Sequence, residues 1–576
     1  MTPVWILPSG DARTARDAEA LGAALGVGPL AARVLIRRGL ADLEAARRFM
    51  APSLDQLHDP KLMCGMESAV ERLARAIRSR EKILIYGDYD VDGTVSVVLL
   101  TKVIELAGGL VDYHVPHRLI DGYGMREEVV EAAAASGVRL IVTVDTGIRA
   151  SKAVRRATEL SIDVIVTDHH LPDAELPPAV AVLDPNRPDC RYPNKNLCGA
   201  GVAFKLAQAL LATLPWPEEK RQRVAESLLK LVAIATVADV VPIVGENRVI
   251  VKHGLAGLGE VRNPGLRALL EVAGFARGTA PSARQVAFQI APRLNAAGRM
   301  DSARAAVELF LTADPARATE LARGLHDRNA DRRQAEDEVR ELCERVSVGA
   351  AEAALVYYDE KWHRGVIGIV ASRLAERFHR PVFVLGRNSE DGLAQGSGRS
   401  IPAFHLLDAL ESMSDLFVRF GGHEHAAGVT LEAARVDEFR ARFNARAAAC
   451  LRPEDLAPRL EIDAVAALAE LTEPNAFGVF ALAPFGNGNQ PPVFAVLGVE
   501  VTGVSPLGKD GKHLSIKVRG AGGVLSVKAW RFAERAAEVA PGARVDIAFT
   551  LEEDAYSAAR GYPAWAATLR EVRPAQ

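Results

Sequence analysis

Short apolar runs alternate with helical segments in the first half of the chain. The runs are too short and too rich in β-branched residues to be helices, and several end in glycine or aspartate. They cover residues 83–86, 111–115, 140–144, 164–166 and 180–183. Between most of them the apolar spacing is that of a helix, as in residues 94–106. This alternation predicts an α/β domain with a mainly parallel sheet, where ligands bind outside the carboxyl ends of the strands.

The pattern changes along the rest of the chain. Residues 1–50 have helical periodicity, and residues 315–346 have the charged composition of a long solvated helix that links two lobes. Apolar runs at 353–358 and 382–385 predict a second α/β domain. The last segment contains PFGNGNQPPVF and alternating runs such as HLSIKVRG and GVLSVKAW between Gly-rich turns. Short strands at that spacing predict a small β-barrel.

A chain of 576 residues is too long for one hydrophobic core. We therefore expect an α/β protein of five parts. They are a helical lead-in, a first α/β domain, a linking helix, a second α/β domain and a C-terminal barrel, at 1–50, 51–312, 313–347, 348–452 and 453–576.

The composition restricts the partners and the compartment. The net charge of −3 excludes a global basic field, so a polyanion site must be a local patch helped by metal ions. The five cysteines are odd in number and scattered, which suits a reducing cytosol. No basic leader and no bilayer-length apolar run is present. We expect a cytoplasmic monomer with no membrane partner and, since no basic tail follows the barrel, no further protein-docking domain.

Acidic and imidazole side chains follow three of the predicted strands, and one further acid lies in the apolar stretch LVAIATVADVVP. These residues are Asp88, Asp90, Asp92, Asp145, Asp168, His169, His170 and Asp239. Each could be an ordinary turn, helix-end or solvated loop residue. Carboxylates gathered at one sheet edge, however, repel one another and resist desolvation unless a cation compensates them. Together they predict a metal site.

The donor types restrict the metal. Several aspartates with one or two histidines and no thiolate suit Mn²⁺ or Mg²⁺ better than structural zinc. The potential ligands are too many for one ion that keeps an open position. Two divalent ions that share a bridging carboxylate are therefore expected, a geometry that serves phosphoryl chemistry.

GDYDVDG, VDTG, the triplet at residues 168–170 and Asp239 resemble the successive motifs of the DHH phosphoesterase superfamily. The resemblance implies a binuclear manganese or magnesium centre. The implied ligands are Asp88, Asp90, Asp92, Asp145, His169 and Asp239. It makes His170 a ligand or a general acid near the leaving group, and Asp168 a partner that orients the histidines. The catalytic candidates are His170, Asp145 and Asp168.

Glycine-rich and basic motifs in the middle of the chain supply candidates for phosphate binding. PHRLIDGYG and QIAPRLNAAGRM are expected to be loops, and GSGRS and FGGHEHAAG to be glycine-dense turns that cradle phosphate. Taken alone, FGGHEHAAG fits an ordinary structural loop as well as it fits a phosphate-binding turn. Because it follows a domain that resembles the DHH domain, however, this part of the chain resembles the DHHA1 substrate-binding domain. The substrate-binding candidates are Arg118, Arg293, Asn295, Arg299, Ser397, Gly398, Arg399, Gly422 and His423.

The order of the motifs over nearly the whole chain resembles the single-strand-specific 5′→3′ DNA exonucleases of this superfamily. The resemblance implies an oligonucleotide-binding fold for the last domain and release of 5′-mononucleotides in repair and recombination. It assigns the terminal 5′-phosphate to Arg118, Arg299, Ser397 and Arg399, with Arg293 and His423 as second choices. The implied partners are single-stranded DNA with a 5′ end, a single-stranded-DNA-binding protein and a helicase.

Some alternatives stay open from the sequence. The barrel candidates are either strand contacts or ordinary surface side chains: Lys512, His513, Lys517, Lys528, Trp530 and Arg531. A small-substrate phosphodiesterase for short oligonucleotides or cyclic dinucleotides, or a pyrophosphatase, would share the metal residues. A non-catalytic single-strand-binding scaffold is disfavoured because every Asp and His that the motifs require is present.

Overall fold

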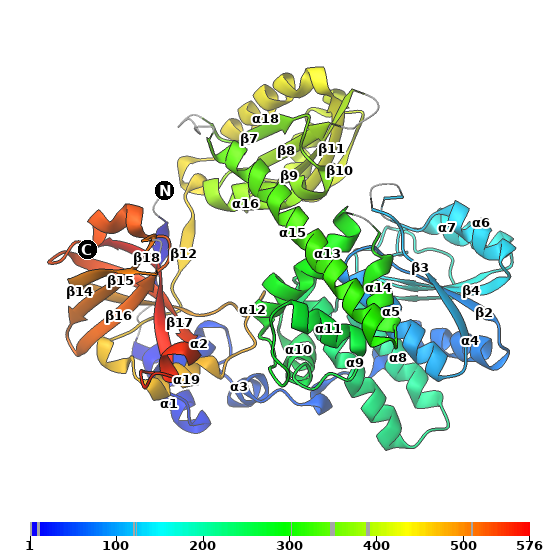
Figure 1. The fold of residues 1–576 in the computed structure, drawn as a ribbon, viewed down its shortest axis with the longest axis horizontal. Helices are drawn as coiled ribbons and strands as arrows, with labels where there is room; N and C mark the ends of the chain where they lie inside the picture. The colour runs from blue at the N-terminus through cyan, green and yellow to red at the C-terminus, as the bar shows by residue number, and fades with distance from the viewer. Residues whose placement is uncertain are drawn as a thin grey trace.

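The computed structural model describes residues 3–8, 12–118, 121–122, 124–300, 302–345, 352–387, 392–508 and 511–575. Two α/β domains are joined by the helix α15 (Pro315–Arg345), and a C-terminal barrel lies beside the first of them (Figure 1). The expected boundary at residues 347 and 348 falls outside the described residues.

A five-stranded parallel sheet forms the centre of the first domain. Its order is β3-β2-β4-β5-β6, as the alternation of apolar runs and helical segments predicts. The strands are β2 (Lys82–Tyr86), β3 (Leu110–His114), β4 (Val138–Val144), β5 (Asp163–Thr167) and β6 (Ala181–Leu183). Every pair is parallel, so all five carboxyl ends meet at one edge. The acidic motifs follow three of these ends.

Helices cover both faces of this sheet (Figure 1). The helices of this domain are α4 (Met66–Arg78), α5 (Val91–Leu106), α6 (Glu127–Ala135), α7 (Ser151–Glu159), α8 (Gly199–Thr213), α9 (Glu218–Ala238), α10 (Gly245–Gly257), α11 (Pro264–Val272), α12 (Ala283–Gln285), α13 (Ala291–Met300) and α14 (Arg304–Leu311). On β2, Ile83 and Ile85 pack toward α4, α5 and α8, whereas Leu84 and Tyr86 pack toward α6 and α7. A strand buried on both faces explains why the run at 83–86 is continuously apolar.

The linking helix is less solvated than its charge suggests. One face of α15 is buried from Ala318 to Cys343 and includes the charged pair Arg332 and Glu336, whose atoms lie 2.8 Å apart. It packs against α11, α13 and α14 below and α16 (Arg364–Phe378) above. The expectation of a solvated connector was therefore wrong for this face, because the helix is a packed element of both domains.

The second domain has a mixed sheet in the order β10-β11-β9-β8-β7. Its remaining elements are β7 (Leu355–Asp359), β8 (Val382–Arg387), β9 (Leu393–Arg399), α17 (Leu406–Glu411), β10 (Arg419–Gly422), β11 (Ala426–Glu432) and α18 (Val436–Cys450). Only the β7–β8 pair is parallel among the described strands of this sheet. GSGRS, expected to be a turn, lies largely on the central strand β9. Its glycines are needed there because a Cβ on Gly398 would lie 2.4 Å from the Phe383 ring.

The last domain is a closed barrel, as predicted. Its strands are β12 (Arg459–Glu461), β13 (Ala464–Val465), β14 (Val493–Leu507), β15 (His513–Gly520), β16 (Gly523–Ala529), β17 (Arg544–Glu553) and β18 (Trp565–Pro574), with helices α19 (Glu473–Phe480) and α20 (Ala555–Ala558). The sheet order is β13-β14-β15-β16-β18-β17, and pairing of β14 with β17 closes the barrel. Closure leaves few exposed strand edges.

The N-terminal segment packs on the barrel at the other end of the sequence (Figure 1). It contains β1 (Val4–Ile6), α1 (Ala12–Leu25), α2 (Pro29–Arg37) and α3 (Leu43–Met50). Leu30, Val34 and Leu35 belong to the same buried cluster as Phe494 and Phe549 of the barrel. The expectation of a purely helical segment was wrong at β1, which pairs in parallel with β12. A three-residue strand leaves too short an apolar pattern to be recognised.

No single helix among the described residues is long and apolar enough to span a membrane. The pair α1 and α2 reaches the necessary length and composition together, but it bends by 116°.

Arg248 on α10 joins the first domain to the C-terminal domain. Its side chain is 1% exposed. Its guanidinium donates hydrogen bonds of 2.7–3.3 Å to the carbonyl oxygens of Phe49, Leu482, Ala483 and Pro484. These bonds hold the segment that leads into PFGNGNQPPVF against α10.

Replacing Arg248 by methionine is expected to lower the free energy of unfolding by about 3 kcal/mol, because four carbonyl groups each lose a charged donor, and, among the described residues, only those of Leu482 and Pro484 keep a hydrogen bond from the Asn489 side-chain amide. Equilibrium unfolding in urea measures the change. The control is Arg284→Ala, which removes an exposed ion pair to Glu552 between the same two domains and should change stability by less than about 0.5 kcal/mol. Equal stabilities of the two variants would contradict the assigned role of Arg248.

Candidate metal centre and phosphate pocket

The loop between β2 and α5 carries the first three aspartates. Asp90 caps α5, and its Oδ1 accepts a hydrogen bond of 3.0 Å from the Gly93 N–H. Gly93 lets the helix approach closely, since a Cβ there would lie 2.7 Å from Asp88. The helix begins at Val91, three residues earlier than predicted, which places Asp92 in its first turn. This tight turn thus keeps the three aspartates close together at the carboxyl end of β2.

Asp92 is held by the N-terminus of α8. Its carboxylate oxygens accept hydrogen bonds of 2.5 Å from the Gly199 N–H and 2.8 Å from the Ala200 N–H. A helix N-terminus stabilises a negative charge. A Cβ on Gly199 would lie 2.6 Å from Asp145, so glycine is required at this position. These backbone donors were not predicted from the sequence, although the glycines of CGAG at the start of the apolar helix were an available signal.

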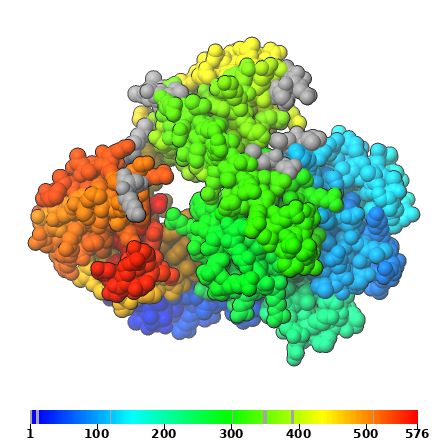
Figure 2. Space-filling view, viewed as in Figure 1, coloured from blue at the N-terminus to red at the C-terminus, as the bar shows by residue number. Residues whose placement is uncertain are grey.

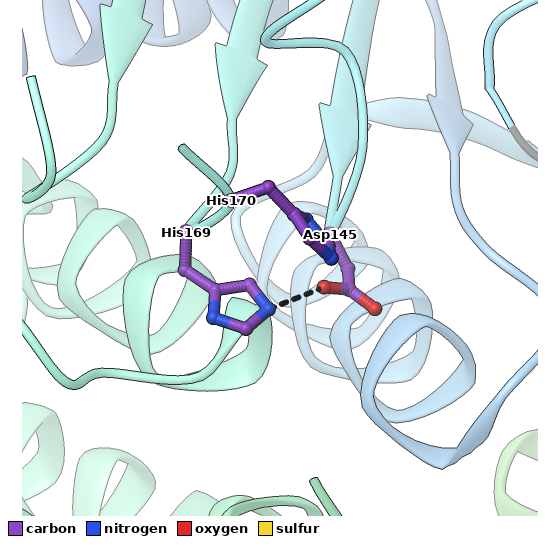
Figure 3. A group of neighbouring side chains, drawn as sticks. All are labelled: Asp145, His169 and His170. Carbon is purple, nitrogen blue, oxygen red and sulfur yellow. Dashed lines mark ion pairs between the residues drawn. The ribbon is translucent and has the colours of Figure 1, made fainter. Parts of the chain in front are cut away.

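Asp145 follows β4 in a left-handed conformation, with φ of +59°. The His169 Nε2 lies 3.1 Å from the Asp145 Oδ1, and Figure 3 shows the ring and the carboxylate facing each other. The same nitrogen is 3.8 Å from an oxygen of Asp92 and 3.8 Å from an oxygen of Asp239. Asp239 caps the end of α9, as its place in the sequence predicts. His169 therefore stands at the centre of three carboxylates.

Asp168 points into the protein and holds the two histidines. It is 0% exposed. Its Oδ1 lies 2.7 Å from the His170 Nδ1 and accepts from the backbone N–H groups of His169 and His170, while Oδ2 accepts from the Ile148 N–H. Burial opposes the charge of Asp168, but the hydrogen bond and charge of His170 bring its pKa below the usual value. Asp168 is thus placed to orient histidines.

The remaining candidates form three overlapping donor sets, in each of which the ligand atoms lie within 4.8 Å of one another. The sets are Asp88, Asp90 and Asp145; Asp92, His169 and Asp239; and Asp145, His169 and His170. Asp145 and His169 each belong to two sets. The sheet edge thus brings all seven predicted ligands together.

Electrostatics of the cluster favour a bound cation. Burial, reinforced by Asp90, raises the pKa of Asp88 to about 8. Burial, with Asp92 and Asp90, raises the pKa of Asp239 to about 9. The Asp88 Oδ1 and the Asp239 Oδ2 are buried and have no hydrogen-bond partner among the described residues. Burial lowers the pKa of the neighbouring His169 imidazole, which favours its metal-binding neutral form. Hard oxygen donors without a hydrogen-bond partner, beside this imidazole, fit Mn²⁺ or Mg²⁺.

These pKa shifts predict that metal binding releases protons. With folded-state pKa values of about 8 and 9, Asp88 and Asp239 are protonated near neutral pH without metal, so the Kd for Mn²⁺ should rise as the pH falls below 9. The metal-free protein should lose stability as the pH rises from the usual carboxyl value of about 4 through these raised values, because the folded state binds the extra protons.

Titration calorimetry of the metal-free protein with Mn²⁺, in buffers of different ionisation enthalpy, counts the released protons. Asp239→Asn should release fewer protons than the unaltered chain. Equal heats in all buffers would contradict the raised pKa values.

A polar cavity of about 390 Å³ lies beside the metal centre, between the two α/β domains. It is lined by four of the predicted residues, Arg118, Arg299, Ser397 and Arg399. The Arg399 guanidinium donates to the Ser397 Oγ at 3.0 Å, and Arg118 lies over the Tyr89 ring at 4.8 Å. Burial, with the charge of Arg118, lowers the pKa of Arg299 to about 10. Three arginine side chains and one serine side chain make this a basic cavity suited to binding phosphate, which we call the arginine pocket.

Other predicted substrate residues lie elsewhere. Arg293, Asn295 and Arg299 were expected in a loop but lie on helix α13. The Arg293 Nε donates to the His326 Nδ1 at 3.3 Å, and the Asn295 Oδ1 accepts from the Val91 N–H at 3.1 Å. Arg293 and Asn295 do not line the arginine pocket, and Asn295 supports the start of α5 instead. QIAPRLNAAGRM was expected to be a loop, but packing of α13 against α15 stabilises a helix there.

Gly398, Gly422 and the exposed His423 also lie outside the lining of the arginine pocket. Gly398 faces Phe383, and Gly422 with φ of +152° ends β10 before the turn that contains His423. Several further residues that line the pocket were not predicted from the sequence. They are Tyr89, Arg364, Gly365, Arg373 and Gln395. Tyr89 lies within GDYDVDG, but only the fold shows that it faces the same cavity as Arg364.

The candidate strand-contact residues of the barrel differ in their exposure and in the contacts that they make. Trp530 is 52% exposed, and its ring meets the His513 ring at 5.0 Å. Lys528 is bound at 2.5 Å to Asp554, whereas Lys517 lies exposed on β15. The His513 Nδ1 accepts a hydrogen bond from the Arg531 N–H. An exposed aromatic side chain on a barrel is suited to base stacking.

Sequence and structure comparisons agree with this architecture. Residues 82–236 match the DHH family, N-terminal domain, residues 351–449 match the DHHA1 domain, and residues 462–562 match the RecJ OB domain. The chain is 39% identical to the single-stranded-DNA-specific exonuclease RecJ of Bacillus subtilis (strain 168), over 91% of this chain and 65% of that protein. It thus spans less than two thirds of that relative. It is 42% identical to RecJ of Dickeya dadantii (strain 3937), over 80% of this chain and 82% of the relative.

Two solved structures of RecJ from Thermus thermophilus cover all of this chain. The complex with Mn²⁺ has a TM-score of 0.84 at 33% identity over 80% of that chain, and the complex with Mg²⁺ has a TM-score of 0.78 at 31% identity over 79%. Metals of the predicted type therefore occur in relatives with this fold. The chain accordingly belongs to the RecJ family of single-stranded-DNA-specific exonucleases, metal-dependent hydrolases with DHH, DHHA1 and OB domains.

Proposed function

We propose that this chain digests single-stranded DNA from the 5′ end with two divalent ions, Mn²⁺ or Mg²⁺, and releases 5′-mononucleotides. The observation that carries the proposal is that the arginine pocket adjoins the carboxylate cluster. Tyr89 lines the pocket and lies in the chain between Asp88 and Asp90. A terminal phosphate bound by the arginines brings the adjacent phosphodiester to the carboxylates.

The metal residues divide between two ions in this proposal. Asp88, Asp90 and Asp145 form one donor set, and Asp92, His169 and Asp239 form the other. Asp145 would be the carboxylate that both ions share, because it belongs to the first set and its Oδ1 lies 3.1 Å from the His169 Nε2 of the second. When bound, two such ions supply hydroxide at neutral pH and offset the charge of the phosphodiester.

The surrounding side chains position the substrate. Asp168 orients His170 through its Nδ1, so that the ring faces the scissile bond and can donate a proton to the leaving oxygen. Arg118, Arg299 and Arg399 bind the terminal 5′-phosphate, which sets the direction of digestion. Burial lowers the pKa of Arg399, but its charge at neutral pH remains.

The shape of the molecule leaves a route by which a single strand can reach the arginine pocket. Figure 2 shows an opening between the barrel, the second α/β domain and the first α/β domain. We infer that the strand passes from the exposed Trp530 side of the barrel toward the arginine pocket. A single-stranded-DNA-binding protein and a helicase would supply the strand, and the five unpaired cysteines suit a reducing cytoplasm.

Digestion of end-labelled DNA tests this proposal. A 5′-labelled strand, its 3′-labelled twin and a blunt duplex are incubated with Mn²⁺, Mg²⁺ or EDTA. We expect immediate release of a labelled mononucleotide from the 5′ label, gradual shortening of the 3′-labelled strand, and no reaction with duplex or EDTA. Immediate release from the 3′ label would overturn the polarity. Cleavage of a dinucleotide alone would support a small-substrate enzyme, and binding without cleavage would support a scaffold.

A further inference from the structure

The segment PFGNGNQPPVF belongs to the barrel domain but makes hydrogen bonds to the first domain. Its loop reaches the first domain and meets the residues just after α9. The Asn487 carbonyl oxygen accepts a hydrogen bond of 2.7 Å from the Ile243 N–H. The Asn487 side-chain amide donates one of 2.6 Å to the Val240 carbonyl oxygen. One asparagine thus binds both ends of the turn at residues 240–243.

The glycines on either side of Asn487 permit this close approach. A Cβ on Gly486 would lie 2.4 Å from the Ile243 Cδ1. Gly488 has φ of +70°, and a Cβ there would lie 3.0 Å from the Pro242 Cβ. The loop is itself held in a tight turn, because the N–H groups of Gly486 and Asn489 each donate to the carbonyl of the other. GNGN is therefore a rigid contact surface.

Val240, the residue held by Asn487, has a strained backbone. Helix α9 ends at Ala238, Asp239 caps it, and Val240 follows with φ of +60°. A left-handed residue at this position after a helix is usually glycine, and a β-branched residue there is unfavourable. The Val240 side chain is 65% exposed, so packing of that side chain does not compensate for the strain. The hydrogen bond from Asn487 is a direct restraint on the turn.

Asp239 depends on that turn for its orientation. Its Oδ2 is buried without a hydrogen-bond partner among the described residues, and it lies 3.8 Å from the His169 Nε2. Within the described part of the chain, no donor therefore aims this oxygen at the centre. The backbone of residues 238–240 sets where the oxygen lies.

We propose that Asn487 is a positioning residue that acts through Asp239: the barrel domain holds the strained turn after α9, and the turn aims this carboxylate at the metal centre. The inference rests on the proposed function, in which Asp239 is a metal ligand. It makes the docking of the barrel domain part of the metal site. Residues that orient a ligand from outside the metal's own shell commonly change metal affinity by about 10–100-fold.

Asn487→Ala tests the inference through metal binding. Titration calorimetry of metal-free protein with Mn²⁺ should show a Kd raised about 10-fold, at the lower end of that range because Asn487 is exposed. In digestion assays kcat should fall at limiting Mn²⁺ and recover at saturating Mn²⁺, while KM for DNA stays unchanged. Arg284→Ala, which removes the exposed ion pair to Glu552 between the same domains, is the matched control and should bind Mn²⁺ normally.

A second variant separates positioning from domain docking. Val240→Gly removes the conformational strain, so in the Asn487→Ala background it should restore Mn²⁺ affinity to within about 2-fold of the unaltered chain. An unchanged Kd in Asn487→Ala, or a raised Kd that Val240→Gly leaves uncorrected, would overturn the inference. If the unaltered chain itself bound no Mn²⁺, the proposed function would fail instead.

Discussion

Asp145→Asn is expected to lower kcat for single-strand digestion by about 10³-fold, the largest effect that the structure predicts for one side chain. Asp145 belongs to two of the three donor sets, and its Oδ1 lies 3.1 Å from His169. An asparagine keeps the shape but removes the charge that two cations would share in the proposed function. Gly199 already packs against Asp145 with no room for a Cβ, so the site cannot supply another carboxylate from that side.

Single-turnover digestion of a 5′-labelled strand at saturating Mn²⁺ measures the loss, and fluorescence anisotropy shows whether strand binding is retained. Asp112→Asn is the matched control, since Asp112 is an exposed aspartate on β3 of the same sheet. It should digest at the normal rate. Normal digestion by Asp145→Asn would exclude Asp145 as a bridging ligand.

Arg399→Met is expected to lower kcat/KM on a strand with a 5′-phosphate by about 100-fold, because a charge-assisted hydrogen bond to phosphate contributes about 1.5–3 kcal/mol. Methionine keeps the apolar stem of the side chain and removes its donors. On a strand with a 5′-hydroxyl the loss should be small, since that strand offers no terminal phosphate. The ratio of the two kcat/KM values is therefore the diagnostic quantity.

The comparison uses paired substrates that differ only at the 5′ end. Arg419→Met is the control: Arg419 is an exposed arginine on β10 of the same sheet, outside the arginine pocket. It should leave the ratio unchanged. A loss of equal size on both substrates would assign Arg399 to general strand binding and not to recognition of the end.

Local patterns predicted the parts of the centre that depend on consecutive residues. The apolar run at 83–86 and the three aspartates after it are adjacent in sequence, and parallel pairing then brings Asp145 and His169 to the same edge. The prediction succeeded because all parallel strands end on one side, whatever their order in the sheet. Asp239 was recognised in another way, as the lone acid in the apolar stretch LVAIATVADVVP, and it caps the end of α9.

Local patterns failed where glycine has a packing role. GSGRS resembles a turn because glycine is depleted in strands, yet β9 needs glycine beside Phe383 and carries Ser397 and Arg399 into the arginine pocket. The segment of α13 likewise resembled a loop, but packing against α15 makes it helical.

The sequence by itself determined the strands, the metal-binding motifs and the type of donor, because these follow from residue type and from spacing within a few positions. Only the tertiary structure decided which distant segments support them. It placed the α8 N-terminus on Asp92, Tyr89 in the arginine pocket and Asn487 on the turn after Asp239. Each of these contacts joins residues far apart in the chain, and its formation depends on how whole domains pack, which short-range periodicity does not encode.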